Sequence, residues 1–564
     1  MQPDTPQSPP FPEKDGRSPV AARPVPQNVA PIGEAQVWLT SMGLAVGIIM
    51  TLFLVGLIMV RGVSVFWPKP VVQLELAEGS DAAIKGSTTL AGEVVMERLA
   101  GPAEDRHAET QLFVGNKDAF GFAFRFLEDE DIVSTSFPEG IVSAERLEYG
   151  DGIFFPKELT TADGATIPAS DPQFTTRFEE LVEEGNDRRA TIKRIEKKEI
   201  GAINRVITSL QIDKKVSGDE AEIAAIDEKI ASLEAEYQVL ADKAGALRER
   251  QSEDTLTYTL TTGDERSEPV SNIIAFYYPN QLSWLQRLGL FFSHMWAFLS
   301  QDPREANTEG GIFPAIFGTF VMTIIMSVMV TPFGVVAAIY LREYAKQGLL
   351  VRGVRISVNN LAGVPSIVFG VFGLGFFIYF VGGWVDQTFF SAKLPNPTYG
   401  TGGIFWASLT LALLTLPVVI VATEEALAAV PRGVREAALA CGASKWQTIQ
   451  RIVLPSATPG ILTGVILAMA RGAGEVAPLM LVGVVKLAPE LPINGIFPFV
   501  HPEQKFMHLG FHIYDLGFQS PDSEAAKPMV FATTFLLILL VIVMNLAAVL
   551  LRNHLRKKYA LASF

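Results

Sequence analysis

The chain has 564 residues, of which 49% are hydrophobic, and its formal net charge at pH 7 is −14. Several apolar runs approach the length that crosses a bilayer, so the composition excludes a purely soluble protein and predicts a polytopic membrane protein with a soluble insert. Between Trp67 and Gln281 there are 42 acidic and 23 basic residues, and this net charge of −19 excludes nucleic acid as a partner of the insert. The single cysteine, Cys441, excludes an intrachain disulfide framework.

The N-terminal part of the chain is expected to be a tail followed by a membrane anchor. Residues 1–36 hold nine prolines and little apolar periodicity, which predicts a disordered cytoplasmic tail. Residues 37–67 contain the first transmembrane helix, Val37–Val60, with Trp38 and Trp67 placed for the two membrane interfaces. Because the apolar run is too long for a signal peptide and follows a long polar tail, we expect a retained anchor rather than a cleaved segment.

Residues 68–281 form the soluble insert, which we expect to be an external α+β domain. The alternating phenylalanines from Phe120 to Phe126 predict strands in its first half, and its second half is predicted to be helical. Apolar residues at alternating spacings of four and three predict a coiled-coil hairpin at about residues 187–251, with Ser217-Gly218-Asp219 as its turn. The seam of its second helix consists of Ile226, Ile230, Leu233, Tyr237, Leu240, Ala244 and Leu247. The hairpin is either a contact arm for a partner or an arm that packs only on itself, and the sequence leaves both open.

Five more transmembrane helices are predicted after the insert. Residues 282–311 come first and carry Gln286, Arg287 and His294 among apolar residues, which predicts an interfacial helix and a linker. The membrane core follows at residues 312–552, with spans predicted at Ile312–Tyr340, Val364–Val381, Ile404–Val421, Ile461–Val485 and Met529–Leu551. Residues 553–564 are expected to be a cytoplasmic tail.

Basic residues in the short loops predict the orientation of the six spans. They gather after the second span, in the segment 424–457 and at the C-terminus, at Arg342, Lys346, Arg352, Arg355, Arg432, Arg435, Lys445, Arg451, Arg552, Arg556, Lys557 and Lys558. Six spans therefore place both termini and the segment 424–457 in the cytoplasm and the acidic insert outside. If Leu282–Leu299 were a seventh span, the insert would lie inside, and this alternative stays open.

The segment 424–457 contains a predicted helical hairpin. Pro431 suits the first position of a short helix that Gly442 can end in a left-handed cap. Ser444 followed by Gln447 is a capping-box pattern, so a second helix is predicted to begin at Lys445 and to stop before Pro455. A compact, charged hairpin between two membrane spans is a suitable docking element for a soluble partner.

The sequence of this hairpin resembles a known motif. Glu436-Ala437-Ala438, Gly442 and Ile452-x-Leu454-Pro455 resemble the EAA loop of ABC importer permeases, and the flanking TEEALAAVPRGVREAA and ARGAGEVAPLML resemble the phosphate-specific transport family, PstA-type. The resemblance implies an α-helical fold of the type I importer class, here enlarged by the insert, which shorter family members lack. It also implies coupling to a cytoplasmic ATPase through Glu436, Ala437, Ala438, Gly442, Ile452, Leu454 and Pro455.

The resemblance implies partners and a location as well. The implied partners are a second permease subunit, identical or different, two ATP-binding subunits, an external phosphate-binding protein and membrane lipid. The implied location is the inner membrane of a bacterium. The pattern G-x-x-x-x-G-K-[ST] does not occur, so this chain is not expected to be an enzyme or to hold a cofactor. ATP and Mg²⁺ would be bound by the partner ATPase.

Arg471 and Glu475 are the candidate substrate-path residues. They lie four positions apart within the predicted fifth span, where ionisable residues normally face a bundle interior or an aqueous path. A guanidinium can bind phosphate through two parallel hydrogen bonds, with Glu475 as its counter-charge. The alternative is a structural ion pair. Related permeases often carry a basic residue where this chain has Val421, so a second cation would have to come from elsewhere. The helix also carries a small-residue packing face at Gly460, Gly464, Ala468 and Gly472.

Other readings of the sequence are less specific. His508 and His512 have a spacing that could hold a metal, but they fall in a predicted loop, so we expect no metal site there. Another oxyanion, such as sulfate or molybdate, is an alternative substrate. A membrane-anchored scaffold or sensor that recruits partners through the external coiled coil is the alternative from a different functional class.

Overall fold

The computed structural model describes residues 35–560, except 85, 101–105, 489, 496, 498, 521 and 522. The chain divides into two units, residues 1–57 and 58–564. The described part of the first unit belongs to helix α1 (Ala35–Ser64), which is apolar around its whole circumference, as in a membrane anchor. The tail predicted at residues 1–36 falls almost entirely outside the described residues.

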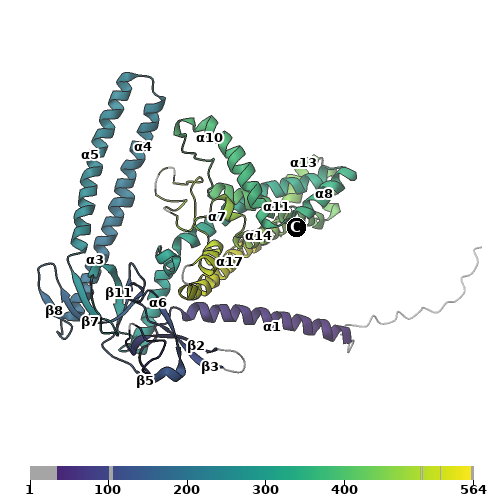
Figure 1. Ribbon diagram of the computed structural model, residues 1–564. Coiled ribbons are helices and arrows are strands. Elements are labelled where there is room, and N and C mark those ends of the chain that lie inside the picture. The colour runs from purple at the N-terminus through teal and green to yellow at the C-terminus, as the bar shows by residue number, and fades with distance from the viewer. Residues whose placement is uncertain are drawn as a thin grey trace, which may run out of the picture. The chain divides into compact units, whose positions relative to one another are not determined.

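Six helices of the described chain are long and apolar enough to cross a membrane, which confirms the predicted number (Figure 1). The first is α1, and the second consists of α7 (Phe313–Ile339) with the π-helical turn η5 (Tyr340–Tyr344). The others are α9 (Ser366–Phe372) with η6 (Gly373–Gly382) and α10 (Gly383–Phe389), then α11 (Ile404–Ala429), then α13 (Lys445–Thr448) with η8 (Ile449–Val453) and α14 (Leu454–Ala473), and finally α17 (Ser523–Ala560). Helix α17 continues through most of the predicted C-terminal tail.

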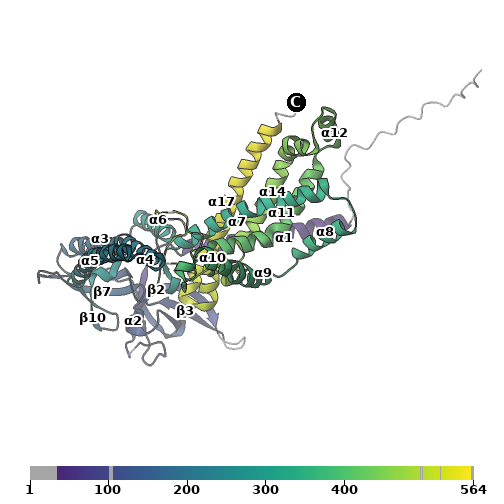
Figure 2. The same ribbon diagram turned by 90° about the horizontal axis from the view of Figure 1, so that it is seen from above.

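Helices α7, α11 and α14 pack side by side and form the membrane core (Figure 2). Met326 of α7 and Leu411 of α11 are fully buried in this core. The helices approach closely because glycines face the contacts: a Cβ at Gly334 would lie 2.5 Å from Cγ1 of Val419. The packing therefore depends on small residues, as expected where lipid removes the hydrophobic drive for association.

The predicted boundaries of the fifth span were wrong. The sequence predicts Ile461–Val485, whereas the structure has one uninterrupted helix from Lys445 to Ala473. At its start the helix does not stop before Pro455, because the π-helical turn η8 lets the amide of Leu454 bond the carbonyl of Ile449. At its end Gly474 caps α14, and the chain turns before the short helix α15 (Leu479–Val482).

Helices α6 (Trp284–Ser300), α8 (Leu349–Leu361) and α16 (Leu509–Tyr514) also lie outside the spans. Helix α6 occupies the predicted interfacial segment, and a capping box of Ser283 and Gln286 begins it. Helix α8 follows the second span, in a segment that the sequence analysis treated as a basic loop. Helix α16 with η9 (Asp515–Gln519) holds both His508, at its N-cap, and His512, so the loop predicted there is wrong.

The insert contains two antiparallel sheets. The first has the order β4-β3-β2-β1-β5, and the second has β10-β9-β7-β6-β11 with β8 paired to β7. The strands of the first sheet are β1 (Val71–Leu76), β2 (Thr89–Ala100), β3 (His107–Phe113), β4 (Phe124–Glu128) and β5 (Ile132–Ser136). Those of the second are β6 (Val142–Arg146), β7 (Gly152–Thr160), β8 (Thr166–Pro168), β9 (Thr255–Thr259), β10 (Glu265–Pro269) and β11 (Ile273–Tyr277).

Two predictions about the insert need correction. The phenylalanine alternation does not form one strand, because Phe120 ends the short helix α2 (Lys117–Phe120) and Gly121 follows in a left-handed conformation, with φ at +79°. Only Phe124 and Phe126 lie in β4. The second half is not wholly helical either, since strands β9–β11 follow the helices and complete the second sheet.

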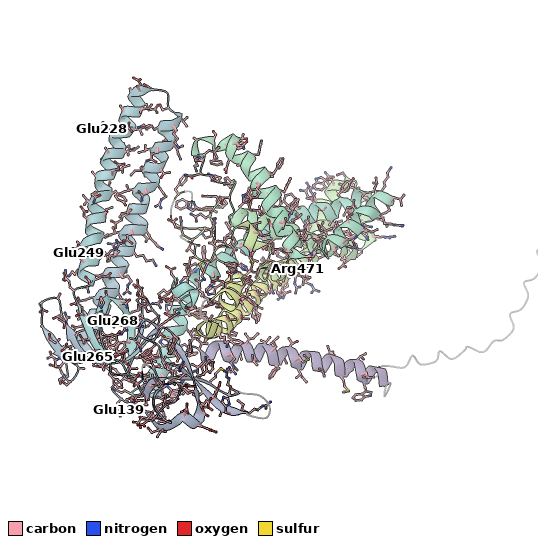
Figure 3. All side chains as sticks on the ribbon, viewed as in Figure 1. Glu139, Glu228, Glu249, Glu265, Glu268 and Arg471 are labelled. Carbon is pink, nitrogen blue, oxygen red and sulfur yellow. The ribbon has the colours of Figure 1, made fainter. Side chains whose placement is uncertain are left out.

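The helices of the insert form an arm that leaves the second sheet and returns to it. The outgoing limb is α3 (Phe174–Arg194), the π-helical turn η2 (Ile195–Ile200) and α4 (Gly201–Val216), and the returning limb is α5 (Glu220–Gln251). Figure 1 shows α4 and α5 side by side, and Figure 3 labels Glu228 and Glu249 toward the tip and the base of α5. Asp219 caps α5 at the tip. Of the predicted α5 seam, Ala244 is buried and most of the other residues are half-buried.

Candidate functional site: a coupling hairpin joined by one helix to an arginine

The predicted hairpin is present, with a sharp glycine turn between its helices. Helix α12 (Arg432–Ala440) ends in a Schellman motif, in which the amide of Ala443 bonds the carbonyl of Ala438 and the amide of Gly442 bonds the carbonyl of Leu439. Gly442 has a φ of +85°, the left-handed conformation predicted for it. The capping box of Ser444 and Gln447 begins α13, as predicted. Pro431 lies one position earlier than predicted, at the N-cap of α12.

Ion pairs fix the hairpin to the membrane helices. The guanidinium of Arg435 lies 3.2 Å from the carboxylate of Glu343 at the end of the second span, and both side chains are largely buried. Lys445 donates to the backbone carbonyl of Glu343. Arg355 of α8 lies 3.2 Å from Glu424 of α11 and braces the same region. From the sequence, Arg355 and Arg435 are predicted only to mark the orientation of the spans, because their partners are far away along the chain.

The hairpin has one packed face and one open face. Ala438 is buried, and Ile449 and Val453 are buried in a cluster with residues of α7 and α11. On the open face Glu436 and Ala437 are exposed, and so are three large apolar side chains, Val434, Leu439 and Trp446. Such a patch on a rigidly anchored element is typical of a protein-docking surface.

The small-residue face of α14 lies against two neighbouring helices. A Cβ at Gly460 would lie 2.5 Å from Cβ of Ala426, and one at Gly464 would lie 2.4 Å from Cβ of Ala422, so these glycines allow α11 to approach. Ala468 is fully buried. Gly472 faces α7, because its Cβ would lie 2.4 Å from Sδ of Met326.

Arg471 lies in the last turn of α14, where Figure 3 labels it, and 39% of its side chain is exposed. Its neighbour Gly472 contacts Met326, which is the middle residue of the 27-residue helix α7. Helix α14 therefore ends near the mid-depth of its neighbour, and Glu475 lies just beyond it, where its amide bonds the carbonyl of Gly472. Discontinuous helices that end at this depth are a recurring feature of transporter binding sites.

The predicted pairing of Arg471 and Glu475 is present but loose. Nε of Arg471 lies 3.7 Å from Oε1 of Glu475, with 39% of the arginine side chain and 21% of the glutamate side chain exposed. Within the described part of the chain, the terminal nitrogens of Arg471 form no hydrogen bond or other ion pair. The planar fork of the guanidinium is therefore open to an oxyanion.

A polar row on α7 was missed by the sequence analysis. Thr319, Thr323, Ser327 and Thr331 are spaced four residues apart, and each donates its hydroxyl to the carbonyl one turn earlier. The first three are buried in the bundle. The four-residue spacing of hydroxyl side chains within an apolar run was the available signal.

His508 and His512 lie at the start of α16 and within it, in a buried environment. His508 and His512 are almost fully buried, and burial lowers the pKa of His508 to about 3 and that of His512 to about 4. Both are therefore neutral near pH 7. Among the described residues there is no group of three or more potential His, Cys, Asp or Glu metal ligands.

Comparisons with known proteins place these features in a family context. Residues 330–557 match the family model described as "Binding-protein-dependent transport system inner membrane component". The chain is 43% identical over 189 residues to the phosphate transport system permease protein PstA of Mycobacterium leprae, a match that covers 33% of this chain and 56% of that one. It is 32% identical over 268 residues to the probable ABC transporter permease protein YqgI of Bacillus subtilis, covering 46% of this chain and 84% of that one.

The matched regions leave part of both chains uncovered. The chain spans 56–60% of the length of the first curated relatives that it matches. Among solved structures, it resembles an inward-facing MetNI methionine ABC transporter with a TM-score of 0.32 and 18% identity, covering 47% of this chain and 98% of that one.

Proposed function

The chain belongs to the PstA-type permease subunits of ABC transporters, and we propose that it forms part of the membrane path through which such a transporter imports inorganic phosphate. It is a multi-pass helical membrane protein with six candidate spans. The relatives named PstA support phosphate as the substrate. The open guanidinium of Arg471 supports an oxyanion, because its fork matches the oxygens of phosphate.

The observation that carries this proposal is the continuous helix from Lys445 to Ala473. It begins in the docking hairpin and ends two residues after Arg471. At 1.5 Å per residue, the 26 steps from Lys445 to Arg471 correspond to about 39 Å. A displacement of the hairpin therefore moves Arg471 as part of one rod, rather than through a chain of loops.

The proposed motor is a cytoplasmic ATPase that docks on the open face of the hairpin. Glu436 and Ala437 are exposed there beside Val434, Leu439 and Trp446. Ile452, Leu454 and Pro455 lie where η8 continues into α14. The ion pair of Arg435 with Glu343 would carry the same force to the second span. The assembly would contain a second permease, two ATP-binding subunits that hold ATP and Mg²⁺, and an external phosphate-binding protein.

The proposed orientation follows from the loop charges. The hairpin and both termini face the cytoplasm of a bacterial cell, and the acidic insert lies outside the inner membrane. A scaffold or sensor would not require a docking hairpin fused to a helix that ends at mid-depth with an arginine. The transport function is therefore favoured over that class.

The test combines assembly and transport. The full chain is co-expressed with the ATPase, the second permease and the phosphate-binding protein of its own organism, and the complex is purified and reconstituted into liposomes. We expect co-purification of the ATPase and ATP-dependent uptake of ³²P-phosphate that unlabelled phosphate inhibits. Inhibition of uptake by sulfate or molybdate, and not by unlabelled phosphate, would identify a different oxyanion as the substrate. Failure to retain any ATPase would refute the coupling role.

A further inference from the structure

A large cavity lies at the base of the arm, outside the site described above. Its volume is about 790 Å³. It is lined by η2 and α4 of the arm, the linker before α7, the start of α7 and the segment after α15, through Lys197, Lys198, Arg205, Asp302, Pro303, Pro314, Leu487, Ala488, Glu490, Leu491, Asn494, Gly495 and Met507. The arm thus borders the same end of the membrane core at which the chain leaves α15.

Two lysines in this cavity have uncompensated charges. Lys197 and Lys198 lie in the π-helical turn η2, whose sequence is IEKKEI, and both are exposed. The two glutamates of the turn face other cations: Glu196 pairs with Arg248, and Glu199 lies 3.6 Å from Arg194. Within the described residues, neither lysine forms an ion pair or a hydrogen bond.

The acidic residues of the cavity are neutralised as well. Asp302 lies 2.5 Å from Nζ of Lys193, and Glu490 lies 3.7 Å from the guanidinium of Arg205. The lining with these partners therefore carries a net charge of about +2, which comes from the two free lysines. This charge is concentrated at one place in an insert whose overall charge is −19, with 42 acidic and 23 basic residues.

The remaining walls strengthen the effect of that charge. Pro314, Leu487, Leu491 and Met507 line the cavity with apolar surface. Low-dielectric walls around charges of one sign focus the field and raise the local concentration of counter-ions. A volume of about 790 Å³ is far larger than one small anion, so the cavity suits a hydrated, loosely held ion rather than a tight complex.

We propose that this cavity is an anion vestibule, in which Lys197 and Lys198 concentrate divalent inorganic oxyanion at the outer end of the membrane path. The proposal rests on the proposed import function and names phosphate as the ion held. It also gives the arm a role: the arm carries the two lysines to the segment after α15. Arg205 acts as a positioning residue, because its pair with Glu490 holds the arm against that segment.

The first experiment measures binding without transport. The purified complex in nanodiscs is acetylated briefly with an amine-reactive ester, and the modification rate of each lysine is read by mass spectrometry. We expect 10 mM inorganic phosphate to slow Lys197 and Lys198 severalfold relative to sodium chloride of equal ionic strength. Lys229, an exposed lysine on α5 that does not line the cavity, is the internal control and should not change. Equal protection by chloride would overturn the proposal.

The second experiment measures transport. The double variant Lys197→Gln/Lys198→Gln should raise the apparent KM for phosphate uptake by about tenfold at low ionic strength and less at 0.15 M salt, with kcat retained. Lys229→Gln is the matched control with unchanged KM. An unchanged KM in the double variant would refute the vestibule while leaving the import function intact. Absence of phosphate uptake by the wild-type complex would refute the import function instead. In that case the first experiment would still test the vestibule, because it measures the protection of the two lysines by phosphate without transport.

Discussion

The glycine turn of the hairpin offers a sharp test of coupling. Gly442 has a φ of +85°, and a Cβ added there would have no heavy atom within 4 Å. The substitution Gly442→Ala therefore introduces no clash and acts only through the conformation of the backbone. An L-residue other than glycine in this region is disfavoured by about 1–2 kcal/mol. That free energy corresponds to a factor of about 5–30 in the population of the native turn.

We expect the loss to appear as a loss of coupling rather than of insertion. The Schellman bonds of Gly442 and Ala443 set the angle between α12 and α13, so a relaxed turn changes the surface offered to the ATPase. In proteoliposomes, Gly442→Ala should reduce phosphate uptake and stimulated ATP hydrolysis by about 5–30-fold at equal expression. Gly442→Asn should lose less, because asparagine tolerates the left-handed region better.

A matched control lies in the same hairpin. Gly433 is in α12, has no positive φ and has open space around an added Cβ. Gly433→Ala should therefore retain full coupling, because it adds a methyl group in open space at a residue whose helical conformation alanine adopts readily. If Gly442→Ala transported at the wild-type rate, the left-handed turn would not be part of the coupling element. Equal losses in both glycine variants would point to a general effect of substitution in the hairpin.

The remaining predictions address topology, packing and pH. Ser217→Cys at the tip of the arm should react with an impermeant maleimide added outside, whereas the native Cys441 of the hairpin should react only in inverted vesicles; labelling of both from one side would contradict the six-span orientation. Gly464→Ala places a Cβ 2.4 Å from an alanine of α11, so it should lower the free energy of unfolding of the purified permease by about 1–3 kcal/mol and lower its melting temperature. Gly433→Ala should leave the melting temperature unchanged, and equal melting temperatures of the two variants would contradict the close approach of the helices. Burial raises the pKa of Glu93 in the insert to about 7, so between about pH 4.5 and pH 7 the folded insert keeps a proton that the unfolded chain has lost. The free energy of unfolding of the insert should therefore fall as the pH rises through this range. Pulse proteolysis of the full chain should show a smaller fall in Glu93→Gln, and the same pH dependence in the variant and the wild type would refute the prediction.

The sequence was most informative where local signals determine structure. Spans of about 20 apolar residues gave the number of membrane helices, and Gly442 with the Ser444–Gln447 pair gave the turn of the hairpin, because caps depend on residues only a few positions apart. The prediction that the second helix of the hairpin ends before Pro455 was wrong because of the local backbone and the surrounding packing. A π-helical turn before that proline and packing of Val453 in the core let the helix continue.

Longer-range features could not be predicted from one sequence. The hydropathy of residues 474–485 suggested a continuing span, but Gly474 ends α14, and the chain continues as the short helix α15, whose last residue bonds to Gly403 at the start of α11. The ion pair of Arg435 with Glu343 joins residues 92 positions apart, which no local pattern records. Strands β9–β11 returned to a sheet begun before the arm, and pairing across such an insertion depends on the assembled fold.

The central claim is that Arg471 binds phosphate on its way through the membrane. The decisive measurement is the uptake of labelled phosphate by reconstituted complexes that contain wild-type, Arg471→Lys or Arg471→Gln permease in equal amounts. Arg471→Gln should assemble with its ATPase but lose uptake, because the substitution removes the positive charge that would compensate the anion there. Arg471→Lys should recover part of the rate, since an ammonium keeps the charge but not the fork. Full uptake by Arg471→Gln would contradict the claim and make its contact with Glu475 a structural ion pair.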